Sequence, residues 1–159
     1  MHKDSQGFQQ SFALADLAAT DALGARIAAS LGVGDAIALQ GDLGTGKTTL
    51  ARAILRALGV TEAVPSPTFT LVQAYETSRL PVRHYDLYRV DDVSDMDELG
   101  FDEALDECAA LIEWPEHAGQ RIPSDALHVM LTLEARARSA RISGPTRWAR
   151  AFDEMHHAG

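Results

Sequence analysis

The chain has 159 residues, of which 46% are hydrophobic and 23% charged, a balance typical of one globular domain with its own apolar core. Its net charge of −9 makes it a poor match for the phosphate backbone, which excludes broad nucleic-acid binding by the chain alone. No apolar run reaches membrane-spanning length, the first residues lack the apolar core of a signal peptide, and the single cysteine, Cys108, rules out an internal disulfide. We therefore expect a cytoplasmic protein without a membrane partner.

The first half of the chain predicts strands and helices in alternation. Residues 9–15 alternate weakly between apolar and polar side chains and predict a strand, which an alanine-rich helix follows up to about Leu31. Residues 35–40 form a short apolar run that is typical of a buried strand, and a glycine-rich loop comes directly after it. Apolar side chains at helical spacing then predict a second helix over residues 48–58.

The second half of the chain predicts strands around one acidic segment. Residues 91–107 contain nine acidic residues and no basic one, and we expect a loop with short helices there. The two strands before this segment are joined by a short connection and predict a hairpin. Strands are expected at residues 69–76, 81–86, 109–114, 126–133 and 136–143.

Together these elements predict an α/β fold: a P-loop NTPase three-layer sandwich with a mixed, partly antiparallel sheet. Parallel pairing is expected near the glycine-rich loop and antiparallel pairing in the hairpins. We expect residues 1–143 to form the domain. The remaining tail, residues 144–159, is expected to hold a short helix with Trp148 and Phe152 on one face.

The segment Gly41-Asp42-Leu43-Gly44-Thr45-Gly46-Lys47-Thr48 matches the pattern of a phosphate-binding loop between a strand and a helix. Its glycines let the backbone turn tightly and bring N–H groups onto phosphate oxygens, and the following helix directs its positive end at the same phosphates. Lys47 is expected to reach the β- and γ-phosphates and Thr48 to offer its hydroxyl to Mg²⁺. The residues expected to bind the nucleotide here are Asp42, Leu43, Gly44, Thr45, Gly46, Lys47, Thr48 and Thr49.

Two carboxylates are candidates for the metal and for the attacking water. Asp86 and Glu113 each end an apolar strand, and open α/β sheets bind ligands at the carboxyl ends of their strands. A phosphate-binding loop needs a carboxylate for the metal and a group that positions the nucleophile. Both residues are therefore expected to be metal-linked and catalytic together with Lys47, and which acid holds the metal stays open.

The composition also bears on the base of the nucleotide. Guanine-specific GTPases recognise the base through an Asn-Lys-x-Asp motif. This chain contains no asparagine at all, which excludes that route to GTP and favours ATP.

Several segments together resemble the TsaE family, also called YjeE, over about residues 10–143. The phosphate-loop segment alone is common to many NTPases, whereas the other segments in this order are far more specific. The order and spacing of the matching segments also fit the family. These other segments are Val64-Pro65-Ser66-Pro67-Thr68-Phe69-Thr70-Leu71-Val72, His84-Tyr85-Asp86-Leu87-Tyr88-Arg89 and Leu111-Ile112-Glu113-Trp114-Pro115-Glu116.

The resemblance implies a function. Members of this family are small bacterial ATPases of tRNA threonylcarbamoyladenosine (t6A) biosynthesis, and they act with a TsaD–TsaB assembly that performs the transfer to adenosine 37. The resemblance thus implies a Mg²⁺-dependent ATPase that is weak without its partners and that resets the assembly between turnovers. The tRNA would be reached only through the assembly.

The resemblance also implies roles for residues outside the glycine-rich loop. Residues 66–69, with Thr68 among them, would act as a switch loop near the γ-phosphate. Trp114 would lie beside the nucleotide, and Thr20 would lie near its base. His84 is interpreted as a packed or exposed strand residue rather than a catalyst, and Arg89 is the only arginine in the motifs.

Two other functions stay open from the residues alone. A small-molecule kinase also has one domain of this size, but it usually adds a lid with arginines that clamp phosphates, and residues 91–107 contain none. A nucleotide-gated binding protein that changes shape and barely hydrolyses ATP is the second alternative. The acidic segment 91–107 is a candidate docking surface for a protein partner.

Overall fold

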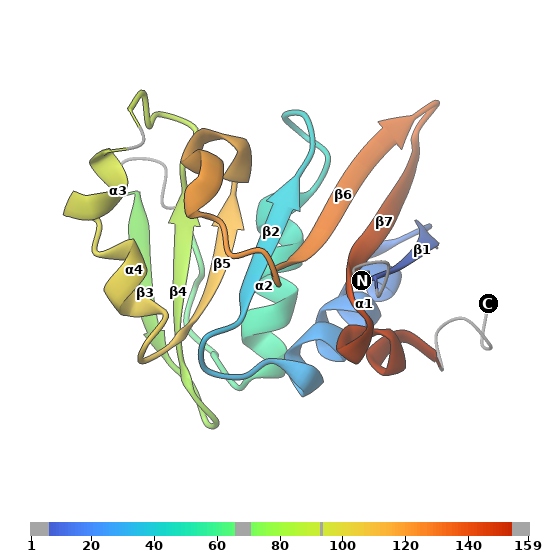
Figure 1. Cartoon of the computed structure of the whole chain (residues 1–159). Helices are drawn as coiled ribbons and strands as arrows, with labels where there is room; N and C mark the ends of the chain where they lie inside the picture. The colour runs from blue at the N-terminus through green and yellow to red at the C-terminus, as the bar shows by residue number, and fades with distance from the viewer. Residues whose placement is uncertain (1–6, 66–70, 93, 154–159) are drawn as a thin grey trace.

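The structure is a computed structural model of the chain, and it describes residues 7–65, 71–92 and 94–153. In this part of the chain, seven strands form one sheet in the order β1-β7-β6-β2-β5-β4-β3 (Figure 1). The strands are β1 (Gly7–Leu14), β2 (Ala36–Gln40), β3 (Val72–Glu76), β4 (Pro81–Asp86), β5 (Ala109–Glu113), β6 (Leu127–Glu134) and β7 (Ala137–Pro145).

The sheet is parallel in its middle and antiparallel at both edges. β2 pairs in parallel with β5 and with β6, and β5 pairs in parallel with β4. The β3–β4 and β6–β7 pairs are antiparallel hairpins, and β1 returns antiparallel to β7. This arrangement confirms the mixed sheet that the sequence predicted, with strand bounds that differ by only a few residues.

Helices cover both faces of the sheet. One core joins α1, α2 and η3 to the sheet, and a second core joins α3, α4 and η2 to it. No helix among the described residues is long and apolar enough to cross a membrane. The helices are α1 (Leu17–Ser30), α2 (Lys47–Ala57), α3 (Asp95–Glu98), α4 (Phe101–Ala104), and the 3₁₀ helices η2 (Pro115–Arg121) and η3 (Thr146–Phe152).

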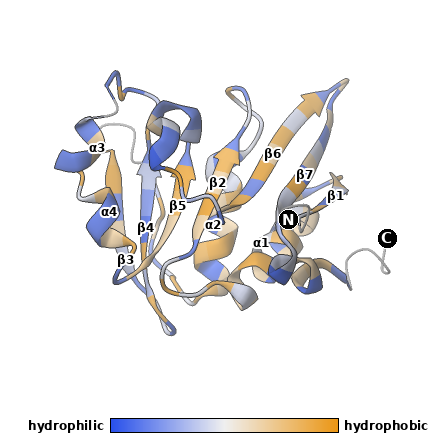
Figure 2. Cartoon of the chain, viewed as in Figure 1, coloured by the Kyte–Doolittle hydropathy of each residue, from blue (hydrophilic) through white to orange (hydrophobic). Residues whose placement is uncertain are grey.

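The central strands are apolar because they are covered on both sides. All five residues of β5 are buried, and successive side chains alternate between the two cores, as Leu111 and Ile112 do. Figure 2 shows β2, β5 and β6 as mainly hydrophobic and α3 as mainly hydrophilic. The same alternation returns Glu113 to the face that α2 covers, which positions its carboxylate beside that helix.

The two long helices pack closely because small residues meet where they cross. Asp16 caps α1 by accepting a hydrogen bond from the Ala19 N–H at 2.9 Å, which sets the start of the helix. Gly24 on α1 faces Ala53 on α2, and a Cβ atom on Gly24 would lie only 2.6 Å from the Cβ of Ala53. Close packing of α1 holds α2, and therefore the loop before it, in a fixed place.

The segment from β7 into η3 belongs to the same core as α1 and α2. β7 continues through Pro145, and η3 then turns Trp148 and Phe152 into the core, where they are 1% and 0% exposed. The Phe152 ring lies 6.0 Å from the ring centre of Phe8 on β1. The expected helix is present as a 3₁₀ helix, and the hydrophobic core extends beyond residue 143 to include it.

Candidate functional site

The site begins with the glycine loop, residues 41–48, which leads from β2 into α2. Gly41 has a φ of +146°, and a Cβ atom there would lie 2.6 Å from the carbonyl oxygen of Leu131. Gly44 has a φ of +83°, and no atom of the described residues lies within 4 Å of the position that a Cβ atom there would take. Other residues would strain the backbone at both positions, so the glycines allow a tight turn with one open flank. Among the described residues, no side chain caps the first turn of α2, and the N–H groups of this turn can therefore bind an anion.

Lys47 is folded back onto the glycine loop. Its Nζ donates to the carbonyl oxygens of Gly41 and Asp42, at 2.6 and 3.0 Å. It also lies 4.2 Å from the centre of the Trp114 ring, which makes a cation–π contact. Burial lowers the pKa of Lys47, while nearby carboxylates, Glu113 first among them, act in the opposite direction.

Glu113 is held from two sides. The Thr48 hydroxyl lies 2.9 and 2.8 Å from the two oxygens of the Glu113 carboxylate and donates to it. From β4, the Nε2 of His84 lies 2.7 Å from Oε2 of the same carboxylate. His84 is fully buried, and Glu113 is 3% exposed. The three side chains therefore form one short hydrogen-bonded chain from α2 through β5 to β4.

Asp86 lies beside Glu113 at the same edge of the sheet. The two residues are directly paired across the parallel strands β4 and β5. Asp86 Oδ1 accepts a hydrogen bond from the Tyr88 N–H at 3.0 Å, which orients the carboxylate as the chain leaves β4. The carboxyl ends of β2, β4 and β5 thus bring the glycine loop and both acids together, as the open-sheet rule predicts.

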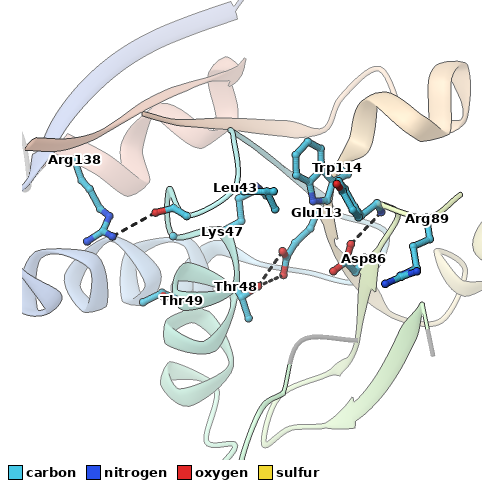
Figure 3. Close-up of a pocket in the computed structure, with 12 residues that line it drawn as sticks. Leu43, Lys47, Thr48, Thr49, Asp86, Arg89, Glu113, Trp114 and Arg138 are labelled. Carbon is cyan, nitrogen blue, oxygen red and sulfur yellow. Dashed lines mark hydrogen bonds between the residues drawn. The ribbon is translucent and has the colours of Figure 1, made fainter. Parts of the chain in front are cut away.

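A cavity of about 390 Å³ lies against the open flank of the loop. Figure 3 shows Arg138 approaching the loop from one side and Asp86 and Arg89 lying on the other. The cavity is lined by Leu43, Gly44, Gly46, Lys47, Thr48, Thr49, Asp86, Tyr88, Arg89, Glu113, Trp114 and Arg138.

A second cavity, of about 260 Å³, lies on the α1 side of the loop. Thr20, which is 7% exposed, lines it from α1, and Thr45 lines it from the loop. Arg136 and Arg138 line it from the β6–β7 hairpin. Gly46, Thr49 and Arg138 line both cavities, so the two spaces adjoin at the loop.

The structure brings together most residues that the sequence singled out. Nine of them line the first cavity: Leu43, Gly44, Gly46, Lys47, Thr48, Thr49, Asp86, Glu113 and Trp114. Thr20 and Thr45 line the second, and Asp42 supplies the carbonyl that Lys47 contacts. Thr68, with the expected switch loop at residues 66–69, lies outside the described residues.

Comparison with known proteins decides the family. The family described as "Threonylcarbamoyl adenosine biosynthesis protein TsaE" matches residues 14–142. The chain belongs to the TsaE family. This membership confirms the resemblance that the motifs indicated.

Individual TsaE relatives agree with this assignment. The tRNA threonylcarbamoyladenosine biosynthesis protein TsaE of Bacillus subtilis is 37% identical over 113 residues, which cover 70% of each chain. The protein of the same name from Synechocystis is 42% identical over 120 residues, which cover 71% of this chain and 74% of the relative. The crystal structure of YdiB from Bacillus subtilis matches over the whole of both chains, with a TM-score of 0.79 and 26% identity.

Two residues of the site were not identified from the sequence. His84 lies on a strand, as expected, and the structure shows that it is buried and that it contacts Glu113. The two-residue spacing from His84 to Asp86 on a strand puts both on one face, a signal that would have indicated the site. Arg138 had no such signal, because only the register of the β6–β7 hairpin brings it over the loop.

The carboxylates do not form a metal centre of their own. Within the described ranges, no group of three or more His, Cys, Asp or Glu side chains is arranged to hold a metal ion. The residues that line the first cavity include Thr48, which carries a hydroxyl, and the two acids Asp86 and Glu113. This is a set of hard oxygen donors of the kind that Mg²⁺ prefers, and Mg²⁺ usually shares such sites with phosphate oxygens.

Proposed function

We propose that this TsaE-family chain is a Mg²⁺-dependent ATPase subunit whose ATP hydrolysis is required for t6A modification of tRNA. It would act with a TsaD–TsaB type assembly in the cytoplasm and reach tRNA only through that assembly. Its fold would be that of a P-loop NTPase, a three-layer sandwich. The observation that carries the proposal is the Thr48–Glu113 contact beside Lys47, at the open flank of the glycine loop.

The glycine loop fits the phosphates of a nucleotide. Its open flank at Gly44 and the uncapped first turn of α2 offer backbone N–H groups to phosphate oxygens. Among the described residues, the hydrogen-bond acceptors of Lys47 are two backbone carbonyls, and a charged phosphate is a stronger acceptor for an ammonium group. Lys47 would therefore leave the carbonyls and bind the β- and γ-phosphates.

The acids fit a magnesium ion and a water molecule. Thr48, Asp86 and Glu113 are the residues that would hold Mg²⁺, which supplies positive charge to the phosphate oxygens when bound. The carboxylate that does not bind the metal would accept a hydrogen bond from the attacking water and so orient it. Trp114 and the exposed Leu43 line the cavity and would exclude water molecules other than the attacking one.

The second cavity fits the nucleoside. It adjoins the first at Gly46 and Thr49, so a ligand with its phosphates on the loop can extend into it. Thr20 and Asp16 line this cavity with groups that can hydrogen-bond to a base or a ribose. Because the chain has no asparagine for an Asn-Lys-x-Asp motif, adenine is the proposed base.

The proposed docking surface for the protein partners is the acidic segment of residues 91–107. The acidic segment 91–107 carries α3 and α4, and it remains our proposed contact for a protein partner. Two of its acidic residues form ion pairs within the molecule, because Arg121 pairs with Asp97 at 2.7 Å and with Asp102 at 3.5 Å. The remaining acidic side chains would face the partner.

Hydrolysis assays on purified protein test the proposal. We expect Mg²⁺-dependent ATP hydrolysis that is slow for the chain alone and rises when TsaD and TsaB are added. Asp86→Asn and Glu113→Gln should each slow this hydrolysis by about 100-fold or more, since charged groups aimed at a transition state have effects of this size. Failure to bind ATP, or phosphate transfer to a small molecule in place of hydrolysis, would contradict the proposal.

A further inference from the structure

The β6–β7 hairpin brings an arginine, Arg138, over the glycine loop. Ala135 and Arg136 at its turn have φ values of +49° and +69°, the left-handed backbone of a tight hairpin turn. This turn sets the register in which Arg138 lies opposite Leu133 on β6 and opposite Leu14 on β1. Arg138 lies about ninety residues after the loop in the sequence. The two are close in space because β6 lies next to β2 in the sheet and β7 lies next to β6.

Arg138 contacts the loop at two of its glycines. Its Nη2 donates a long hydrogen bond, 3.4 Å, to the carbonyl oxygen of Gly44. Its Nε lies 4.0 Å from the position that a Cβ atom on Gly46 would take. The guanidinium therefore lies over the stretch of backbone whose N–H groups would bind phosphate.

Within the part of the chain that the structure describes, no carboxylate balances the charge of Arg138. Among the described residues, no carboxylate forms an ion pair with it, whereas Arg121 and Arg147 each pair with aspartates. A single long hydrogen bond to a neutral carbonyl is a weak interaction for a guanidinium group. A guanidinium group binds an anion more strongly, through two parallel N–H donors. The side chain is exposed and can therefore turn to such an anion.

The location of Arg138 indicates which anion this is. Arg138 lines both the first cavity, which contains Lys47 and Thr48, and the second cavity, which contains Thr20. If the nucleoside occupies the second cavity and the terminal phosphates the first, the α-phosphate and its bridge to the β-phosphate must lie where the cavities meet. Arg138 stands at this meeting point.

We propose that Arg138 is a nucleotide-binding residue that donates hydrogen bonds to the α- and β-phosphate oxygens of ATP. This assignment rests on the proposed function. It gives the C-terminal hairpin a part in a site that the sequence motifs assign to other segments. Because ADP has the same two phosphates, Arg138 holds ATP and ADP alike, whereas Lys47 also reaches the γ-phosphate.

Calorimetric titration with MgATP and MgADP tests this role. Arg138→Ala should weaken the binding of both nucleotides to a similar degree, by about 10- to 100-fold, the usual effect of losing charged hydrogen bonds. Arg141→Ala is the matched control, since Arg141 is exposed on the same strand but faces the other side of the sheet. The control should bind both nucleotides within about twofold of the unmodified chain, because it is remote from both cavities.

The outcomes separate this inference from the function on which it rests. Equal thermal unfolding of the unmodified chain and Arg138→Ala without nucleotide will show that the fold is kept. Binding that Lys47→Ala weakens and Arg138→Ala leaves unchanged would overturn the role of Arg138 alone. A loss of ATP binding without a loss of ADP binding would also overturn it. If the unmodified chain binds no ATP, the proposed function falls together with the inference.

Discussion

At the scale of single residues, the most restrained group in the site is the carboxylate of Glu113. Thr48 reaches it from α2 and His84 reaches it from β4, so the carboxylate cannot turn without breaking one contact. The other ring nitrogen of His84, Nδ1, is buried and has no hydrogen-bond partner among the described residues. The contact with Glu113 is therefore the polar interaction that accounts for a histidine at this buried position.

Replacing His84 should affect the rate of hydrolysis rather than the affinity for ATP. We expect His84→Ala to lower kcat by about 10- to 100-fold, because a misplaced catalytic carboxylate typically loses that much, and to change the Kd of ATP by less than about threefold. His84→Gln keeps an N–H donor and should recover part of the rate. His128→Ala, on β6 at the end of the sheet away from the loop, is the control, and a normal kcat in folded His84→Ala would remove the role of His84.

Lys47 should matter for activity but not for folding. Lys47→Ala is expected to abolish ATP hydrolysis, since the ammonium is the cation of the loop that reaches the terminal phosphates. The fold should remain, because burying this ammonium already costs free energy, as the lowered pKa indicates. Full hydrolysis by Lys47→Ala would remove the claim that the glycine loop binds ATP.

The lowered pKa of Lys47 also predicts how stability depends on pH. The unfolded chain holds this proton to a higher pH than the folded chain, so folding is penalised most at pH values below the folded pKa and less as the pH rises through it. The free energy of unfolding of the unmodified chain should therefore increase, relative to that of Lys47→Met, as the pH rises from neutrality. Urea denaturation at several pH values measures this difference, and a decrease would contradict the sign.

At the scale of elements, the sequence predicted the parts of the fold that depend on local pattern. The apolar runs of β2 and β5 and the glycines of the loop have local causes, and they lie where they were expected. η3 was recognised as a helix, but its place in the core depends on where β7 ends and on contacts with β1. The place of Arg138 over the loop and the contact between His84 and Glu113 depend on strand register. Strand register could not be predicted from the sequence alone.

The crossing of α1 and α2 gives a test at this scale. Helix propensity alone favours Ala over Gly inside a helix by about 1 kcal/mol. At Gly24 the added methyl group would lie 2.6 Å from the Cβ of Ala53 and 2.9 Å from its backbone carbonyl carbon, and overpacking of this kind costs about 1–3 kcal/mol. We expect Gly24→Ala to destabilise the protein in urea denaturation, while Ser30→Ala on an exposed part of α1 stays neutral. If Gly24→Ala were more stable than the unmodified chain, α1 and α2 would have to move apart at little cost in free energy, which would contradict the close packing at their crossing.

At the scale of the whole molecule, the sheet order assembles the site from distant parts of the chain. β2, β4 and β5 supply the loop and the acids, while β6 and β7 lie next to β2 and bring the C-terminal hairpin to the same edge. η3, which follows β7, packs into the same core as α1. The positions of the two acids, Asp86 and Glu113, and of the two proposed cations, Lys47 and Arg138, therefore depend on strands from both halves of the chain.

The most direct test of the central claim is the amount of t6A in tRNA, measured by mass spectrometry of digested nucleosides. The gene for this chain is deleted in its own cells and replaced by the unmodified gene or by the Lys47→Ala variant. We expect t6A to fall in the deletion strain, to recover with the unmodified gene, and to stay low with Lys47→Ala at an equal protein level. Normal t6A in the deletion strain, or full recovery with Lys47→Ala, would contradict a role for ATP turnover at this site in the modification of tRNA.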